Sequence, residues 1–212
     1  RLSSHKHKPI PVNPALRIAM DLLEALHEAG AQAQPLSDGK SSYAGGGLVP
    51  DSVLVGSDGK TRLLDVGVAG PCGSVSTIAR HREMVAYSSP EQVDGKPLDV
   101  RANVYAVGVM LWEMLAGKRL YVGSTHSAVV ERIKSGEPPR LDASKPVGGE
   151  PIPKNVADVV ARAIDSAPER RFESPQAMSE ALAAAAESAS HAGVAALIDD
   201  LAGNTLATRR KV

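Results

Sequence analysis

The sequence lacks most of the features that would place it in a specialised class. Its 212 residues contain a single cysteine, Cys72, and equal numbers of acidic and basic side chains. One cysteine excludes an internal disulfide and is typical of a reducing compartment, so we expect a cytoplasmic location. A formal charge of zero gives no broad basic surface, which argues against a nucleic-acid partner. No apolar run approaches the roughly 18 residues of a membrane-spanning helix, so no membrane contact is expected within this chain.

What the sequence does have is a series of helix signals, in a chain long enough to bury a sizeable core. The first helix follows Asn13, a good N-cap, and apolar residues then recur at helical spacing until about Gly30. The run 104–112 has almost no polar face, which predicts a buried central helix from about Asp99 to Leu115. Further helices are expected at 125–135, 154–165 and 175–187, and a short one within 188–212.

Other segments interrupt this helical pattern. Residues 52–55 and 61–64 are β-rich, and the turn signal Ser-Asp-Gly at 57–59 between them predicts a small hairpin. Residues 31–47 are polar and rich in Gly and Ser, which predicts a loop. Residues 67–90 show no steady period. They predict a long irregular segment, and such segments in compact domains are usually functional.

Five short motifs follow one another along the chain. They are the segment 48–56, Asp65-Val66-Gly67, Ser89-Pro90-Glu91, the segment 103–108, and Pro168-Glu169-Arg170-Arg171-Phe172. Their order and spacing resemble the C-terminal lobe of a bacterial serine/threonine protein kinase, over residues 12–187. The resemblance implies a mainly α fold, a kinase C-lobe-like helical domain with a small β-hairpin. Residues 1–11 are then a linker, and residues 188–212 are a C-terminal tail.

The resemblance does not extend to the N-terminal lobe of a kinase. We find no Gly-rich phosphate loop and no strand Lys with a partner Glu, which family enzymes use to hold the nucleotide phosphates. The domain is therefore expected to consist of the C-lobe alone. The chain begins with Arg1 rather than methionine, so we also expect a fragment whose true N-terminus lies upstream. The sequence leaves open whether an N-lobe precedes Arg1.

The resemblance also assigns positions to a degenerate catalytic set. The catalytic base of a kinase would fall at Gly47, which has no side chain to accept a proton. Ser52 and Asp65 fall at the two metal-ligand positions and are the candidate metal ligands. Asp65 and Leu54 are the candidate nucleotide contacts, since Leu54 matches the residue beneath the adenine ring. We expect no cofactor, and ATP with Mg²⁺ only if some activity is retained.

These assignments have ordinary alternatives. Asp65 also suits an Asp-x-Gly turn after a strand, where the carboxylate binds its own backbone. Leu54 also suits simple strand packing. If the loop aligns with a gap, Asp51 becomes the candidate for the functional acid in place of Gly47.

A different kind of site joins two of the motifs. The resemblance implies an ion pair between Glu91 and Arg171, which would tie the irregular segment to the late helices. Arginine suits this role because its planar fork can hold a carboxylate through two hydrogen bonds. The alternative is two unrelated surface charges.

The patterns together lead to one preferred interpretation and two alternatives. We expect a catalytically inactive kinase-fold domain, a pseudokinase, that binds a protein partner through the segment 67–90 and the helix at 125–135. The first alternative is a fragment of an ATP-dependent serine/threonine kinase whose N-lobe lies upstream. The second is a helical adaptor that only mimics the motif order, and it predicts neither the Glu91–Arg171 pair nor the hairpin. The oligomeric state stays open.

Overall fold

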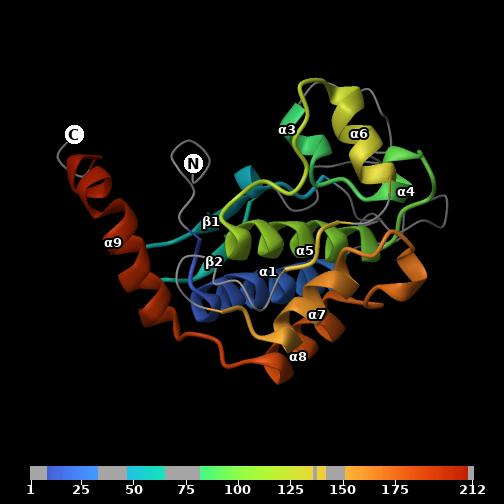
Figure 1. The fold of residues 1–212 in the computed structure, drawn as a ribbon. Coiled ribbons are helices and arrows are strands. Elements are labelled where there is room, and N and C mark those ends of the chain that lie inside the picture. Colours follow the sequence, from blue (N-terminus) through green and yellow to red (C-terminus); the bar gives the residue numbers. More distant parts are fainter. Residues whose placement is uncertain (1–8, 33–46, 65–81, 136–137, 142–150, 210–212) are drawn as a thin grey trace.

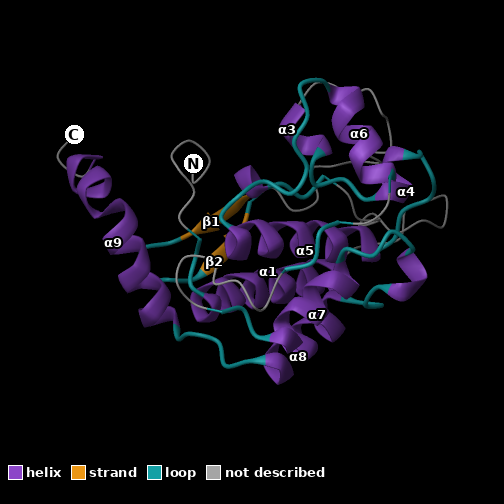
Figure 2. Ribbon diagram, viewed as in Figure 1, coloured by secondary structure: helices purple, strands orange, loops and turns teal. Residues whose placement is uncertain are grey.

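The computed structural model describes residues 9–32, 47–64, 82–135, 138–141 and 151–209. This part of the chain is mainly helical and contains one two-stranded antiparallel sheet, so the expected mainly α fold with a small hairpin is confirmed (Figures 1 and 2). None of its helices is long and apolar enough to cross a bilayer. The helices are α1 (Val12–Gln32), α3 (Arg82–Val85), α4 (Pro90–Val93), α5 (Arg101–Ala116), α6 (His126–Lys134), α7 (Lys154–Ala163), α8 (Pro175–Ala185) and α9 (His191–Arg209), with 3₁₀ turns at Pro50–Ser52 and Pro168–Arg170.

Helix α5 is the centre of the domain, as its apolar sequence predicts. Every residue from Ala102 to Trp112 is buried. Helices α1 and α7 pack against α5, and α8 lies against both of them, whereas α3, α4 and α6 gather at the opposite end (Figure 1). A helix that is apolar all round needs cover on all sides, which explains this arrangement. Gly117 ends α5 in the left-handed conformation, with φ at 62°.

Local capping signals explain two of the other helix starts. The Thr125 hydroxyl accepts a hydrogen bond from the Ala128 amide at 3.1 Å and caps α6. The Ser174 hydroxyl accepts one from the Ala177 amide, also at 3.1 Å, and caps α8. Each bond satisfies an amide that the first turn of a helix leaves without a partner.

Some boundaries differ from the sequence-based expectation. Helix α1 begins at Val12, before Asn13, because the Pro11 carbonyl already accepts a hydrogen bond from the Ala15 amide at 3.1 Å. Helix α9 is 19 residues long rather than short. The segment 67–90 contains the short helix α3 in its described part. A four-residue helix is too short to produce a periodic signal in the sequence.

The small sheet forms where the sequence predicts it and lies against α1. Strands β1 (Val53–Val55) and β2 (Thr61–Leu63) pair antiparallel, with Val53 opposite Leu63 and Val55 opposite Thr61. The turn closes through a hydrogen bond from the Gly56 amide to the Lys60 carbonyl at 2.9 Å. The hairpin contacts α1 through β2.

The close approach of α5 and α7 depends on Gly108. A Cβ atom at this position would lie 2.8 Å from Cγ2 of Ile164 and 2.9 Å from Cβ of Ala163. We therefore expect Gly108→Ala to lower the free energy of unfolding by about 1–3 kcal/mol, because overpacking outweighs the better helix propensity of alanine. Chemical denaturation measures the change.

Gly193→Ala in α9 is the matched control for this substitution. A Cβ there would meet no atom closer than 3.5 Å, so only helix propensity changes. We expect this variant to gain up to about 1 kcal/mol of stability. Equal effects of the two substitutions would show that α5 and α7 are not packed as closely as described.

Candidate functional site

The carboxylate of Glu91 and the guanidinium of Arg171 form a direct, two-pronged ion pair. Nη1 of Arg171 donates to Oε1 of Glu91 at 2.7 Å, and Nη2 donates to Oε2 at 2.8 Å. Glu91 lies in α4, and Arg171 directly follows the 3₁₀ turn at Pro168–Arg170. The pair implied by the two motifs is therefore present. With the hairpin also present, the structure excludes the helical adaptor that predicts neither feature.

Arg171 uses every one of its five N–H groups. Besides the two bonds to Glu91, Nη1 donates to the Arg101 carbonyl at 3.3 Å. Nη2 donates to the Ser166 carbonyl at 3.2 Å, and Nε donates to the Asp165 carbonyl at 2.7 Å. The side chain is 0% exposed to solvent. A buried guanidinium is stable only when all of its donors are paired, and here they are.

The electrostatics of Glu91 follow from the same contacts. Burial opposes the charged form of this carboxyl, but the hydrogen bonds and the positive charge of Arg171 outweigh it. The pKa of Glu91 therefore lies below its ordinary value, and the carboxylate is ionised at neutral pH. The ring of Tyr105 lies 4.8 Å from the Arg171 guanidinium and covers it from α5.

A second polar cluster fixes the chain just before Glu91, and sequence reasoning missed it. The Tyr87 hydroxyl donates to Oε2 of Glu113 at 2.7 Å, and Oε1 of Glu113 accepts from the Leu120 amide at 3.0 Å. Arg119 contacts both the Tyr87 hydroxyl and Glu113. The three side chains come from α3–α4, α5 and the turn after α5, so no local spacing in the sequence indicates that they meet.

The structure places most of the positions expected for the catalytic set in one stretch that leads into the hairpin. Gly47 has φ +89°, and a Cβ there would meet nothing within 4 Å, so the expected base position is open backbone. The Ser52 hydroxyl donates to the Val49 carbonyl at 2.7 Å and accepts from the Val49 amide at 3.3 Å. Asp51, the alternative acid, is exposed at the start of this turn. Asp65 lies outside the described residues.

Leu54 does not pack as an ordinary strand residue. Its side chain is 48% exposed, and its partner across the hairpin, Arg62, is also exposed. The other face of the hairpin, with Val53 and Thr61, is turned toward the body. The exposed face of β1 therefore carries an apolar side chain that the described part of the chain leaves open, with Leu64 43% exposed just beyond β2.

The described residues hold only part of the implied magnesium site, because Asp65, one of its two candidate ligands, lies outside them. Mg²⁺ needs oxygen ligands that are free to coordinate it. Gly47 offers no side chain, and the Ser52 hydroxyl hydrogen-bonds to the Val49 backbone and keeps one lone pair. Among the described residues, no group of three or more His, Cys, Asp or Glu side chains could hold a metal ion.

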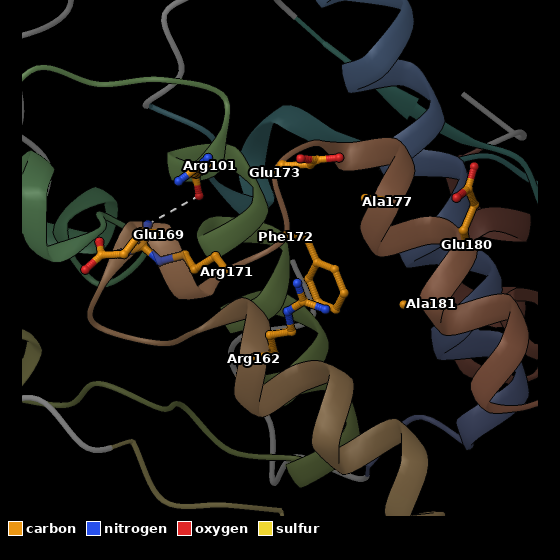
Figure 3. Close-up of a pocket in the computed structure, with 9 residues that line it drawn as sticks. All are labelled: Arg101, Arg162, Glu169, Arg171, Phe172, Glu173, Ala177, Glu180 and Ala181. Atoms are coloured by element: carbon orange, nitrogen blue, oxygen red, sulfur yellow. Dashed lines mark hydrogen bonds between the residues drawn. The ribbon is translucent and has the colours of Figure 1, made fainter.

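A cavity of about 420 Å³ opens elsewhere, beside Arg171 (Figure 3). None of its lining residues belongs to the hairpin or to the catalytic set. The guanidinium of Arg162 lies 4.2 Å from the Phe172 ring and covers that aromatic face. The lining residues are Arg101, Arg162, Glu169, Arg171, Phe172, Glu173, Ala177, Glu180 and Ala181. The cavity is therefore lined largely by charged side chains of both signs and offers no open aromatic surface.

Glu91→Ala should destabilise the fold strongly. The substitution leaves the buried guanidinium of Arg171 without its counter-charge, which typically costs about 3–5 kcal/mol. Urea denaturation of both proteins measures the difference in the free energy of unfolding. Glu169→Ala is the control, because Glu169 is exposed and removing its charge should cost less than about 1 kcal/mol. A loss at Glu91 no larger than the loss at Glu169 would mean that the pair does not anchor α4.

Comparison with known proteins agrees with the kinase-type fold that the hairpin and the Glu91–Arg171 pair indicate. The protein kinase domain family matches residues 48–182, a range that includes the hairpin, Glu91 and Arg171. The serine/threonine-protein kinase PknL of Mycobacterium tuberculosis is 30% identical over 168 residues, which cover 76% of this chain and 41% of that protein. The tyrosine-protein kinase MasK of Myxococcus xanthus is 28% identical over 193 residues, 86% of this chain and 28% of MasK. The chain thus spans less than half the length of these relatives, and it belongs to the protein kinase domain family.

Proposed function

We propose that this domain is a pseudokinase that acts as a protein-binding or regulatory module. One contrast supports the proposal. The structural anchor of the lobe, Arg171, has all five donors paired, whereas the base position is Gly47 and the Ser52 hydroxyl is used in a backbone turn. The loss of a general base alone typically lowers a rate by about 10²–10⁴-fold. The features that hold the fold are present, whereas position 47 lacks a base and position 52 carries only a neutral hydroxyl.

A second candidate function is ATP-dependent phosphotransfer to protein hydroxyl groups, by a longer protein of which this chain is one lobe. Two observations favour it. The relatives are named serine/threonine and tyrosine kinases, and the chain covers less than half of their length. The exposed Leu54 also suits it, because an adenine ring needs an open apolar contact. The presence of Gly47 at the expected base position and of Ser52 at a metal-ligand position argues against this function.

A phosphotransfer assay distinguishes the two functions. We expect the protein at its full encoded length to transfer no labelled phosphate from Mg-ATP to a generic basic protein above a mock preparation. Asp65→Ala is the control, since Asp65 is the one carboxylate left in the catalytic set. Transfer that is present in the parent protein and lost in Asp65→Ala would establish the second function and overturn the first.

Nucleotide binding provides an independent readout in the same samples. A ligand that binds the native state at 100 times its Kd stabilises it by about 2.7 kcal/mol, which a thermal-shift titration detects easily. We expect no magnesium-dependent rise in Tm at sub-millimolar ATP, since the neutral hydroxyl of Ser52 is a poor ligand for Mg²⁺. A clear rise with Mg-ATP, but not with ATP and a chelator, would contradict this.

The protein partner is proposed to bind the outer face of α6. This helix packs against α3 and α4, burying Val129 and Ile133 while Arg132 is exposed. The Nζ atom of Lys134 lies 2.6 Å from Oδ1 of Asp94, which ties the end of α6 to the chain after α4. The exposed face of α6 is therefore charged. It stands apart from α1, α7 and α8 (Figure 1), which suits a surface for docking another protein.

Site-specific photocrosslinking in the source cells tests this surface. We expect a crosslinker at Arg132 to give a discrete higher-mass adduct. The same crosslinker at Ala184, which is exposed on α8, should give none. Charge reversal of Lys134 should weaken the adduct formed at position 132. Identical patterns at the two positions would mean that α6 is not the binding surface.

A further inference from the structure

The segment between α8 and α9 is bound tightly to α1. Nε of Arg17 donates to the Ala189 carbonyl at 2.8 Å, and Nη2 donates to the Ser188 hydroxyl at 2.7 Å. The Ala189 amide donates to the Asn13 carbonyl at 3.0 Å. These bonds join residues more than 170 positions apart in the sequence, so the start of the tail is part of the packed body.

One carboxylate then joins three elements. Asp21, on the next turn of α1, accepts a hydrogen bond from the Thr61 amide of β2 at 3.1 Å. It also lies 3.0 Å from Nε2 of His191, the first residue of α9, and 3.7 Å from Arg17. The Asp21 side chain is only 9% exposed, so these partners take the place of most of the water that would hydrate its carboxylate. A buried carboxylate needs such partners, and removing any one of them disturbs the others.

The hairpin turn also touches the first turn of α9 directly. A Cβ at Gly59 would lie 1.8 Å from the carbonyl oxygen of His191 and 2.9 Å from the amide nitrogen of Ala195. Both are backbone atoms, which cannot swing aside as a flexible side chain can. One turn further along α9, Val194 is fully buried. Beyond it, α9 projects away from the body (Figure 1).

From these contacts we propose that residues 188–195 are a strap that couples the position of the C-terminal helix to that of the hairpin. The hairpin carries Leu54 and is preceded by Gly47 and Ser52, so a displacement of α9 would move the surface that faces the candidate nucleotide site. A partner that pulls or binds the projecting part of α9 would act on that surface through Asp21 and Gly59. The coupling does not depend on whether the domain is catalytically active.

Coupling between two sites must act in both directions, which gives two independent tests. The first test changes a residue of α9 and measures amide hydrogen exchange in the hairpin. His191→Ala removes a contact to Asp21 from α9, and its side chain is 40% exposed, so the variant should fold. We expect amide hydrogen exchange at Gly56 and Leu64 to accelerate by about ten- to a hundredfold, the range for losing a hydrogen bond to a charged group. Exchange in α5 should stay unchanged.

The second test changes a residue of the hairpin turn and measures amide hydrogen exchange in α9. Gly59→Ala introduces the clash with His191, and we expect faster exchange at the Val194 amide, which donates to the Ser190 carbonyl. Because Gly59 has φ +76°, alanine also brings backbone strain. Gly47→Ala and Gly95→Ala are the controls, since both positions have positive φ and open space around a Cβ.

The outcomes separate the proposal from a merely structural role. Faster exchange at Val194 in Gly59→Ala, with no change in either control, supports the strap. Unchanged hairpin exchange in His191→Ala, or equal effects of all three glycine substitutions on α9, would overturn it. If Gly59→Ala fails to fold, His191→Ala still decides. A uniform acceleration that includes α5 in His191→Ala would also overturn the proposal, because it would mean a loss of global stability rather than local coupling.

Discussion

The buried guanidinium of Arg171 is the constraint on which much of this lobe depends. Its five N–H groups point to a carboxylate on α4, to the carbonyls of Asp165 and Ser166 after α7, and to the first residue of α5. Water cannot substitute for these partners, because the side chain has no exposed surface. The relative positions of α4, α5 and the chain that follows α7 are therefore set together. None of them can shift without leaving a buried charge or donor without its partner.

The two kinds of site in this chain face different physical demands. The Glu91–Arg171 pair serves the fold itself, so any loss is felt directly as instability. A catalytic base and a metal ligand contribute little to folding, and both positions tolerate replacements that make good local structure. Gly47 supplies a positive φ, and Ser52 closes a turn through its own hydroxyl. A lobe can therefore keep its architecture when the residues at such positions are replaced.

How far the sequence predicts this structure depends on the range of each signal. Thr125, Ser174 and Gly117 act within one helical turn, and the helices they cap or end are found where expected. The family resemblance adds the long-range pair Glu91–Arg171, which lies 80 residues apart in the sequence. By contrast, the cluster of Tyr87, Glu113 and Arg119 carries no local pattern. The docking of His191 on Asp21 spans 170 residues, and an isolated histidine gives no sign of its partner.

The packing of α1 also has a consequence for biosynthesis. Leu16, Leu23 and Leu26 are almost completely buried, and the helix that carries them, α1, packs against α5, α8 and α9. A ribosome that adds ~5–20 residues per second makes α8 on the order of ten seconds after α1. During that interval the nascent chain holds an amphipathic helix without its native cover, which is the situation in which chaperones are needed. Since many contacts join the two ends of the sequence, folding must wait for nearly the whole chain and should be slow.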